Sequence, residues 1–372
     1  MTAVAPFTFH VGDLRTGVIW DTLPLSVTSP VTRFIGRPGQ AGFALPVLDE
    51  SCPAEWERLT ARRRAMIVVA DDRARIVWCG WIEKRRRTAV DVVTLECVEI
   101  AGYAGFRHVP DLTYTAQDQT SVIFAALAGI LADGATAGIP LTVSAAASSV
   151  TRDREYFAAE RATVLTRVSQ LAAVEDGFEW TIDTAWTDAT HTAVEHTARS
   201  GYPMLGTIVA EPAVVFEIPS GIAGSPSSVF EVPGGVIDFE LTEPGPATHV
   251  VAVGDGSNEA QTVSAAVIDT TAELALPRFE HVAQFTGVTV QATIDAHAEA
   301  EALRVFGTAQ DSLALSSRYD QDPRFGSYGL GDTVRARIET AAVSWDEVVR
   351  VTGWSLDPGA DAVAPVLTRL VV

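Results

Sequence analysis

The stretch FGSYGLGDTVRARI, from Phe325 to Ile338, decides the fold because its three glycines allow two interpretations. It could be a phosphate-binding loop or a tight turn that leads into a β-strand. A phosphate-binding loop needs Gly-Lys-Ser/Thr and then a helix, so that backbone amides converge on the anion. Here Asp332 follows Gly331, and a carboxylate at this place repels phosphate. The sequence therefore argues against a nucleotide site.

The residues that follow the glycines alternate in the way typical of a strand. The apolar members fall at every second position: Val334, Ala336 and Ile338. A period of two predicts a strand with one buried face. We expect Gly329 and Gly331 to supply positive φ angles for the turn, and Asp332 to accept a hydrogen bond from its own backbone.

Composition limits the kind of protein. A chain of 372 residues predicts two or three domains. Its 47% hydrophobic and 20% charged residues argue against disorder. The net charge of −20, with Lys84 as the only lysine, opposes tight binding to a nucleic-acid backbone. We therefore expect no specific nucleic-acid binding.

The cysteines and the apolar runs exclude other classes. Cys52, Cys79 and Cys97 are far apart and odd in number, so neither a disulfide framework nor a paired-cysteine metal site is predicted. The first residues lack a basic region followed by an apolar core, and no signal peptide is expected. No apolar run reaches about 18 residues, so no membrane span is expected.

The pattern of elements changes twice along the chain. Residues 1–110 contain short apolar runs broken by Gly and Pro, and MIVVADDRARIVWCGWIEKRRR predicts a hairpin with its turn at Asp71–Arg73. Residues 111–205 contain two stretches with helical spacing, QTSVIFAALAGILADG and ATVLTRVSQLAAVEDG. Asp118 or Thr120 can cap the first, which Gly134 follows. FEWTID then predicts a strand.

After about residue 205 the strand pattern returns and encloses one more helix. TIDAHAEAEALRVFGTA has helical spacing. The residues expected to face inward are Ala296, Ala300, Leu303 and Phe306. In residues 1–110, many short strands at even spacing suggest a barrel or a sandwich.

This order of segments, together with several local stretches, resembles a known family. The stretches are VGDLRTG at 11–17, IVWCGWIE at 76–83, YGLGDTVRARI at 328–338 and VVRVTGWSLDP at 348–358. The chain is similar to the tail-hub, or tail-associated minor tail, proteins of long-tailed actinobacteriophages, which share the architecture of baseplate hubs.

The resemblance implies a β-rich α+β fold with two antiparallel β-barrel-like domains and an inserted α/β portion. The expected parts are an N-terminal barrel at 1–110, an α/β domain at 111–205, the second barrel at 206–239 and 307–372, and a continued α/β portion at 240–306.

The resemblance also implies a structural function in the virion. The expected assembly is a homotrimeric ring at the tail tip that joins the sixfold tail tube or distal tail ring to the threefold tip and lines the DNA exit channel. Expected partners are the distal tail protein, the tape measure protein and tail fibre or tip proteins. Two alternatives stay open, a distal tail ring protein and a cell-wall hydrolase. Many relatives end in a peptidase or glycosidase domain, but this sequence ends just after the second predicted barrel, and no enzyme is expected.

Two motifs resemble metal sites but have the wrong spacing. HTAVEH, from His191 to His196, has one residue more than the His-x-x-Glu-His zinc motif. VGDGSNE, at 253–259, offers oxygen donors but lacks the full calcium-loop pattern, and Asp-Gly suits a hairpin turn. No metal or cofactor is expected.

Catalytic patterns are equally weak. No Gly-x-Ser-x-Gly occurs, and the cysteines lie in apolar strand patterns. The pairs Asp49-Glu50 and Asp71-Asp72 are adjacent at predicted turns, where their carboxylates diverge. No catalytic residue is predicted.

Two basic runs are the remaining candidates for a site, and both lie at the open end of the predicted hairpin. They comprise Arg62, Arg63, Arg64, Lys84, Arg85, Arg86 and Arg87. One interpretation is a solvated end balanced by Glu55, Glu57 and Glu83. The other is a docking patch for an acidic neighbouring ring or for other subunits.

Overall fold

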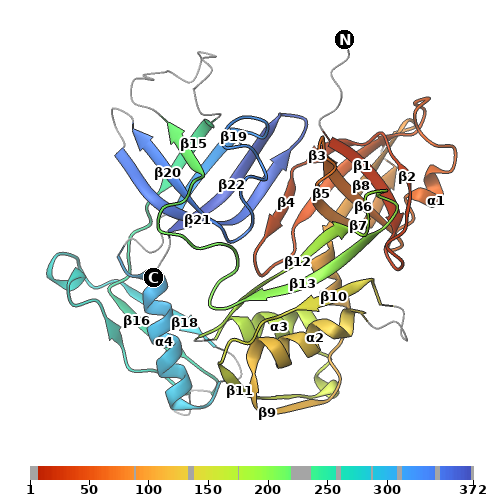
Figure 1. The fold of residues 1–372 in the computed structure, drawn as a ribbon. Helices are drawn as coiled ribbons and strands as arrows, with labels where there is room; N and C mark the ends of the chain where they lie inside the picture. Colours follow the sequence, from red (N-terminus) through yellow and green to blue (C-terminus); the bar gives the residue numbers. More distant parts are fainter. Residues whose placement is uncertain are drawn as a thin grey trace. The chain divides into compact units, whose positions relative to one another are not determined.

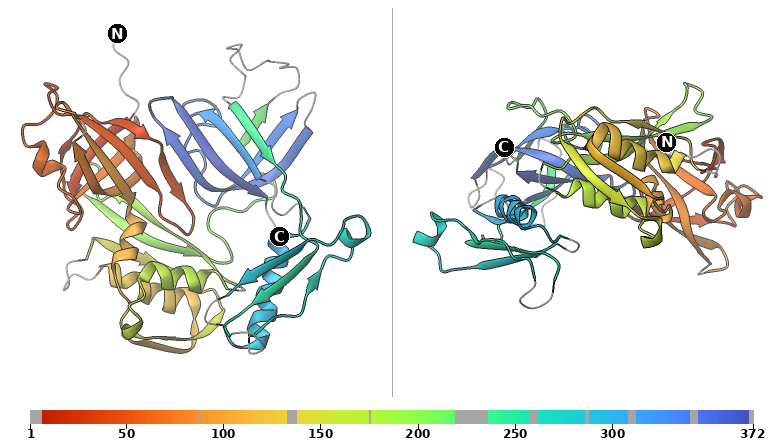
Figure 2. Two further views of the ribbon diagram at one scale, coloured as in Figure 1. Left: turned by 180° about the vertical axis from the view of Figure 1, so that it is seen from behind. Right: turned by 90° about the horizontal axis from the view of Figure 1, so that it is seen from below.

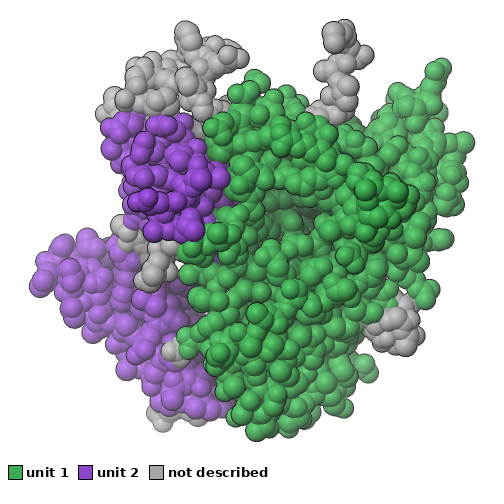
Figure 3. Space-filling model, viewed as in Figure 1, with its two compact units in different colours: residues 1–208, 317–332, 352–365 green, residues 209–316, 333–351, 366–372 purple. Residues whose placement is uncertain are grey.

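The structure is a computed structural model (Figure 1). It describes residues 7–87, 89–132, 138–174, 176–218, 236–256, 261–285, 288–307, 312–339 and 344–369. The chain forms two compact units, which Figure 3 colours separately. Unit 1 comprises Met1–Ile208, Ser317–Asp332 and Thr352–Pro365, and unit 2 comprises Val209–Ser316, Thr333–Val351 and Val366–Val372.

A seven-stranded antiparallel sheet forms the first part of unit 1, in the order β2-β1-β6-β7-β8-β5-β3. Its strands are β1 (Phe7–Asp13), β2 (Ile19–Thr22), β3 (Ser26–Ser29), β5 (Gln40–Pro46), β6 (Ala65–Asp71), β7 (Ile76–Arg87) and β8 (Val92–Glu99). A short helix, α1 (Trp56–Leu59), precedes β6. The predicted hairpin is confirmed, and Asp71 Oδ1 accepts hydrogen bonds from the backbone N–H groups of Arg73 and Arg75 in its turn.

Helices cover a smaller sheet in the rest of unit 1. The sheet has the order β10-β13-β12, with β10 (Leu141–Ser144) parallel to β13 (Val194–Gly201) and β12 (Glu179–Trp186) antiparallel to it. A second pair joins β9 (Leu112–Asp118) and β11 (Thr151–Tyr156). The helical segments are Ile100–Phe106, Gln119–Phe124, α2 (Ala125–Gly129), Ile130–Ala132, Ala158–Glu160 and α3 (Val164–Ala172).

Both helices predicted for this region are confirmed, and their apolar sides face the sheet (Figure 1). One buried cluster joins Ile123, Leu127 and Val168 of the helices to Trp180 and Ala198 of the sheet. The side chain of Asp118 accepts hydrogen bonds from the N–H groups of Thr120 and Ser121, which makes it the N-cap. Thr163 caps α3 in the same way. Gly134 lies outside the described residues.

A second curled sheet has the order β14-β20-β21-β22-β19-β15, and β4 (Val31–Phe34) also pairs with β21. Its other strands are β14 (Val215–Ile218), β15 (Val236–Thr242), β19 (Ser312–Arg318), β20 (Thr333–Glu339), β21 (Ser344–Asp357) and β22 (Ala362–Arg369). Antiparallel pairing joins β20 to β21, whereas β14 runs parallel to β20. The predicted strand after the glycines is β20, and its apolar residues at 334, 336 and 338 are buried.

The glycine-rich stretch before β20 is a turn. Gly331 has a φ of 92°, and Asp332 Oδ2 accepts a 2.7 Å hydrogen bond from the N–H of Gly329. Asp332 Oδ1 accepts another, also of 2.7 Å, from the N–H of Thr207. The prediction was wrong for Gly329, because the second positive φ of the turn belongs to Gly326, at 93°. Hydrogen bonds within the protein thus occupy the Asp332 carboxylate.

The remaining sheet lies in unit 2 and packs against one helix (Figure 2). Its order is β17-β16-β18, made of β16 (His249–Val253), β17 (Val267–Ile268) and β18 (Glu280–Gln284). A 3-10 turn covers Ala272–Leu274, and the helix is α4 (Gln291–Val305). The helix is confirmed, and of its predicted inward residues Phe306 packs on the cluster of Ala302 and Val305, but the rest of the predicted face was wrong. Its buried residues are Ile294, His297, Ala298, Ala302 and Val305, whereas Leu303 is 66% exposed.

The fold class is confirmed as β-rich α+β, and the two larger sheets curl like half-barrels (Figure 1). The domain boundaries given above stay a prediction. No helix in the described ranges combines the length and the apolar character needed to cross a bilayer.

Candidate docking surface

Both basic runs lie at one end of the β6–β7 hairpin, opposite its turn. The register pairs Met66 with Trp81, and the N–H of Arg63 donates a 2.8 Å hydrogen bond to the carbonyl of Ile82. The run 62–64 therefore stands beside the end of β7, where the run 84–87 begins. The hairpin register brings the two runs together, although about 20 residues separate them in the sequence.

Carboxylates pair with most of these basic side chains. The pairs are Arg63 with Glu83, Arg64 with Asp13, Lys84 and Arg86 with Glu96, and Arg87 with Glu57. The basic partners are about 60% exposed, so solvent screens these pairs and each adds little to stability. Glu55 pairs with Arg58 and not with either run. The carboxylates orient the basic groups more than they stabilise the fold.

Aromatic rings also hold the arginines in place. The guanidinium carbons of Arg58 and Arg64 lie 5.3 and 5.4 Å from the ring centre of Trp20. Those of Arg85 and Arg87 lie 5.6 and 5.1 Å from Trp56. Cation–π contacts of this kind limit the freedom of exposed side chains. Four arginines of this surface thus contact aromatic rings of their own chain.

We call this surface the cationic end, and define it by nine basic residues. They are Arg15, Arg58, Arg62, Arg63, Arg64, Lys84, Arg85, Arg86 and Arg87. Five carboxylates pair with them, which leaves an excess of four positive charges. Within the described part of the chain, Arg15 and Arg62 have exposed side chains and no carboxylate partner.

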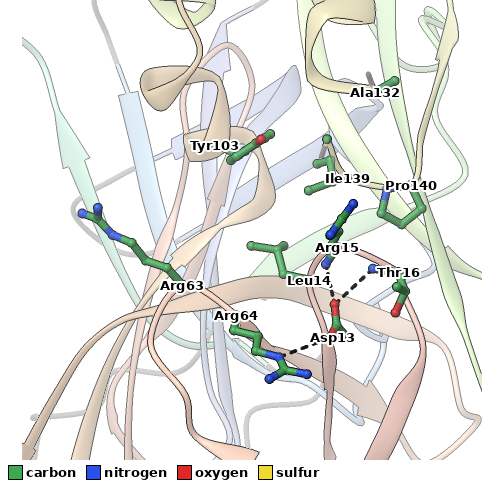
Figure 4. Close-up of a pocket in the computed structure, with 11 residues that line it drawn as sticks. Asp13, Leu14, Arg15, Thr16, Arg63, Arg64, Tyr103, Ala132, Ile139 and Pro140 are labelled. Carbon is green, nitrogen blue, oxygen red and sulfur yellow. Dashed lines mark hydrogen bonds and ion pairs between the residues drawn. The ribbon is translucent and has the colours of Figure 1, made fainter. Parts of the chain in front are cut away.

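A pocket of about 900 Å³ opens beside the cationic end (Figure 4). Arg15, Arg63 and Arg64 are among the residues that line it. The other described residues that line it are Asp13, Leu14, Thr16, Tyr103, Ala132, Gly138, Ile139 and Pro140. The hydroxyl of Tyr103 accepts a 3.0 Å hydrogen bond from Arg107. The pocket thus presents three arginines and the Asp13 carboxylate beside several apolar residues, and none of these lining residues pairs a nucleophile with a base.

The residues of HTAVEH point in different directions. His196 is fully buried, and its Nδ1 lies 2.9 Å from Thr184 Oγ1. Glu195 is exposed on the other face of β13. His191 lies in the turn before β13, and its ring packs on Trp186 at the end of β12. The described residues contain no group of three or more potential metal ligands. Burial lowers the pKa of His196 to about 4, so its ring is neutral.

The other candidate catalytic residues are either buried or already bonded within the protein. Cys79 and Cys97 are buried, and burial raises the pKa of the Cys79 thiol to about 12 and that of Cys97 above its usual range. Both are protonated thiols at neutral pH, which makes them poor nucleophiles. Asp72 forms a 2.8 Å ion pair with Arg324. Asp255 is described, but Asn258 and Glu259 of the same motif lie outside the described residues.

Unit 1 also contains a buried ion network that the sequence patterns did not predict. Arg33 Nε lies 3.0 Å from Glu99 Oε1, and its Nη2 donates to Asp183 and to the carbonyl of Ile182. Glu99 also accepts a 2.7 Å hydrogen bond from the N–H of Gly39. The signal was present, because Glu99 occupies the buried face of β8 at the end of an apolar alternation.

Comparison with known proteins shows the fold. No protein-family model matches the chain, and no curated protein matches its sequence. The tail protein of Neisseria meningitidis MC58 matches with a TM-score of 0.57 and 14% identity, over 98% of this chain and 96% of that one. The 43 kDa tail protein of prophage MuSo2 from Shewanella oneidensis matches with 0.58 and 12%, over 97% and 98%.

A third solved structure agrees with these two. The prophage tail protein of Listeria monocytogenes EGD-e matches with a TM-score of 0.52 and 11% identity, over 98% of this chain and 94% of that one. At these identities the likeness concerns the fold alone. The chain therefore has, over nearly its whole length, the fold of solved phage tail proteins.

Proposed function

We propose that the chain is a structural protein of a phage tail and acts as the hub of the tail tip. The observation that carries this proposal is the length of the match. Three solved tail proteins share the fold over 97–98% of this chain and 94–98% of theirs. A match that included only one sheet would fit many unrelated functions, because common folds serve several.

In this proposal three copies form a ring around the tail axis. Each copy contributes two curled sheets, so a trimer presents six of them in pseudo-sixfold order. Such a ring joins a sixfold tail tube or distal tail ring to a threefold tip. The tape measure protein, the distal tail protein and the fibre or tip proteins are its neighbours. The net charge of −20 keeps exiting DNA from adhering to the channel.

The environment of the reactive side chains supports a structural role over a hydrolytic one. The thiols of Cys79 and Cys97 are buried, and the carboxylates of Asp71, Asp72 and Asp332 accept hydrogen bonds from turns or pair with arginine. A cell-wall hydrolase needs an accessible acid–base or nucleophile–base pair. In a zymogram with peptidoglycan, we expect the purified protein to leave the gel uncleared, and clearing would contradict the proposal.

Copy number in the particle tests the hub itself. Quantitative mass spectrometry of purified virions, normalised to a tail-tube protein, should give three copies per tail. Immunogold labelling should place them at the tip. Six copies would favour the distal tail ring protein, and absence from the virion would contradict both.

A further inference from the structure

We propose that the cationic end of one copy docks against the acidic strand β15 of a second copy. The proposal rests on the proposed function, in which several copies assemble into one ring.

The acidic partner lies in a long stretch without basic residues. Between Arg199 and Arg278 the sequence has no Lys or Arg, whereas it has ten Asp and Glu residues. Within this stretch, Asp238 and Glu240 of β15 are exposed and the intervening Phe239 is partly buried. Glu243 follows and is also exposed. One face of this strand therefore presents carboxylates to solvent.

These carboxylates are unpaired where the structure shows them. Asp238, Glu240 and Glu243 have no ion pair with any described residue. Among the described strands β15 ends the strand order of its sheet, so it is an edge strand there, although it also contacts β14 at the other end of that order. Charges on an edge strand hinder unspecific pairing with other strands, and they also select for a basic partner.

The cationic end is the complementary surface. Arg15 and Arg62 have no carboxylate partner among the described residues, and the ion pair of Arg64 with Asp13 is long, at 3.5 Å. The guanidinium carbon of Arg64 lies 5.4 Å from the ring centre of Trp20. The free carboxylates and the free guanidinium groups thus lie on different parts of the chain, which suits a head-to-tail contact between copies.

Nucleic acid fits this surface less well than an acidic strand does. Asp13, Glu57, Glu83 and Glu96 lie among the basic residues, and they would face the continuous charge of a phosphate backbone. A β-strand carries its carboxylates at separate positions. They can therefore contact Arg15 and Arg62 without lying against the acidic residues of the cationic end. Pairs of this exposure are individually weak, so the contact should be salt-sensitive.

Matched charge reversals test the contact. R15E/R62E alters the cationic end, and R73E/R161E changes the net charge equally at exposed arginines elsewhere. D238K/E240K alters β15, and E50K/E155K is its control. Self-association is measured by sedimentation velocity at low salt. We expect R15E/R62E and D238K/E240K each to weaken association about tenfold. The two control variants should associate like wild type. The quadruple variant R15E/R62E/D238K/E240K should recover association, because the charges are exchanged across the contact.

A crosslink between copies gives a second, independent readout. Copies carrying R62C and copies carrying E240C, with different tags, are mixed and treated with a bifunctional maleimide. We expect a crosslinked pair with both tags, which is lost at high salt. Cys79 and Cys97 are buried, whereas Cys52 is partly exposed, so both copies also carry C52S and a pair without R62C or E240C serves as the control.

Three results would overturn the proposal. The first is equal association of R15E/R62E and R73E/R161E. The second is the absence of both concentration-dependent association and the crosslink. The third is binding of a labelled DNA duplex that R15E/R62E abolishes. Three copies at the tail tip alongside any of these results would refute this contact and leave the hub intact, so the two failures are distinguishable.

Discussion

Arg33 and Glu99 form a buried ion pair in unit 1, with Arg33 Nε 3.0 Å from Glu99 Oε1. The side chain of Glu99 is 4% exposed and that of Arg33 17%. The pair links β4 to the end of β8, and Arg33 extends the link to Asp183 of β12. Burial raises the pKa of Glu99 to about 7, and Arg33 opposes this rise. One arginine thus joins three strands that are distant in the sequence.

Replacing Arg33 should destabilise the protein strongly. Arg33→Met leaves Glu99 without its cation in a dry environment, and removing one partner of a buried pair costs about 3–5 kcal/mol. Urea unfolding should show this loss. The double variant R33M/E99M removes both charges, so it should be more stable than R33M. Equal stability of R33M and wild type would show that the pair contributes nothing.

The buried imidazole of His196 should make the protein less stable in acid. Burial lowers its pKa from 6.5 to about 4, so the native state binds fewer protons than the unfolded state between these values. Stability from this group is complete above about pH 6.5 and falls as the pH drops toward 4. The loss should be about 3 kcal/mol.

The measurement for His196 compares urea unfolding at pH 7.5 and pH 4.5. His196→Phe should be less stable than wild type at the higher pH, because Thr184 loses its partner. It should also lose much less stability between the two pH values. If His196→Phe lost as much free energy of unfolding as wild type between pH 7.5 and pH 4.5, groups other than His196 would cause the acid sensitivity.

Two glycines of the opening stretch should respond very differently to alanine. At Gly331, with a φ of 92°, a Cβ would lie 2.3 Å from the carbonyl oxygen of Leu205. At Gly329 the nearest atom would be Asp332 Oδ2, at 3.3 Å. Gly331→Ala should therefore cost more than about 2 kcal/mol, and Gly329→Ala less than about 1. Thermal melts of both variants check the order, and a reversed order would refute the turn geometry.

Asp118 should contribute a measurable helix cap. Its Oδ1 accepts hydrogen bonds from the N–H groups of Thr120 and Ser121, and its Oδ2 accepts one from the N–H of Ser149. Burial alone would raise its pKa, but the hydrogen bonds from Ser121 and Thr120 hold that pKa well below its usual range. Asp118→Ala should cost about 1–2 kcal/mol in urea unfolding at pH 7. Asp118→Asn, which keeps an acceptor, should cost less.

The sequence predicted those elements whose burial depends on a local repeat. The alternation in 333–338 and in 178–182 identified β20 and β12, because each strand buries one face. The face of α4 was not predictable in the same way. Alanines occur around most of that helix, so the sequence does not mark which side meets β16. The sheet selects Ile294, Ala298 and Ala302.

Contacts between distant segments were the least predictable. The two basic runs could be placed together because one hairpin turn sets their register. The partner of Glu55 could not be predicted, because Arg58, three residues further on in the sequence, competes with both basic runs for this carboxylate. Arg33 and Glu99 are 66 residues apart, and only the paired strands bring them together. Their pairing follows from tertiary structure, which no local pattern encodes.

The number of copies at the tail tip tests the proposed hub most directly. Cryo-electron microscopy of intact particles, with the tip reconstructed without imposed symmetry, should show three copies arranged around the axis below the sixfold tube. Each copy should place its two curled sheets side by side in one ring. A tip that contains six copies would support the distal tail ring instead, and a particle without this chain would contradict the structural function.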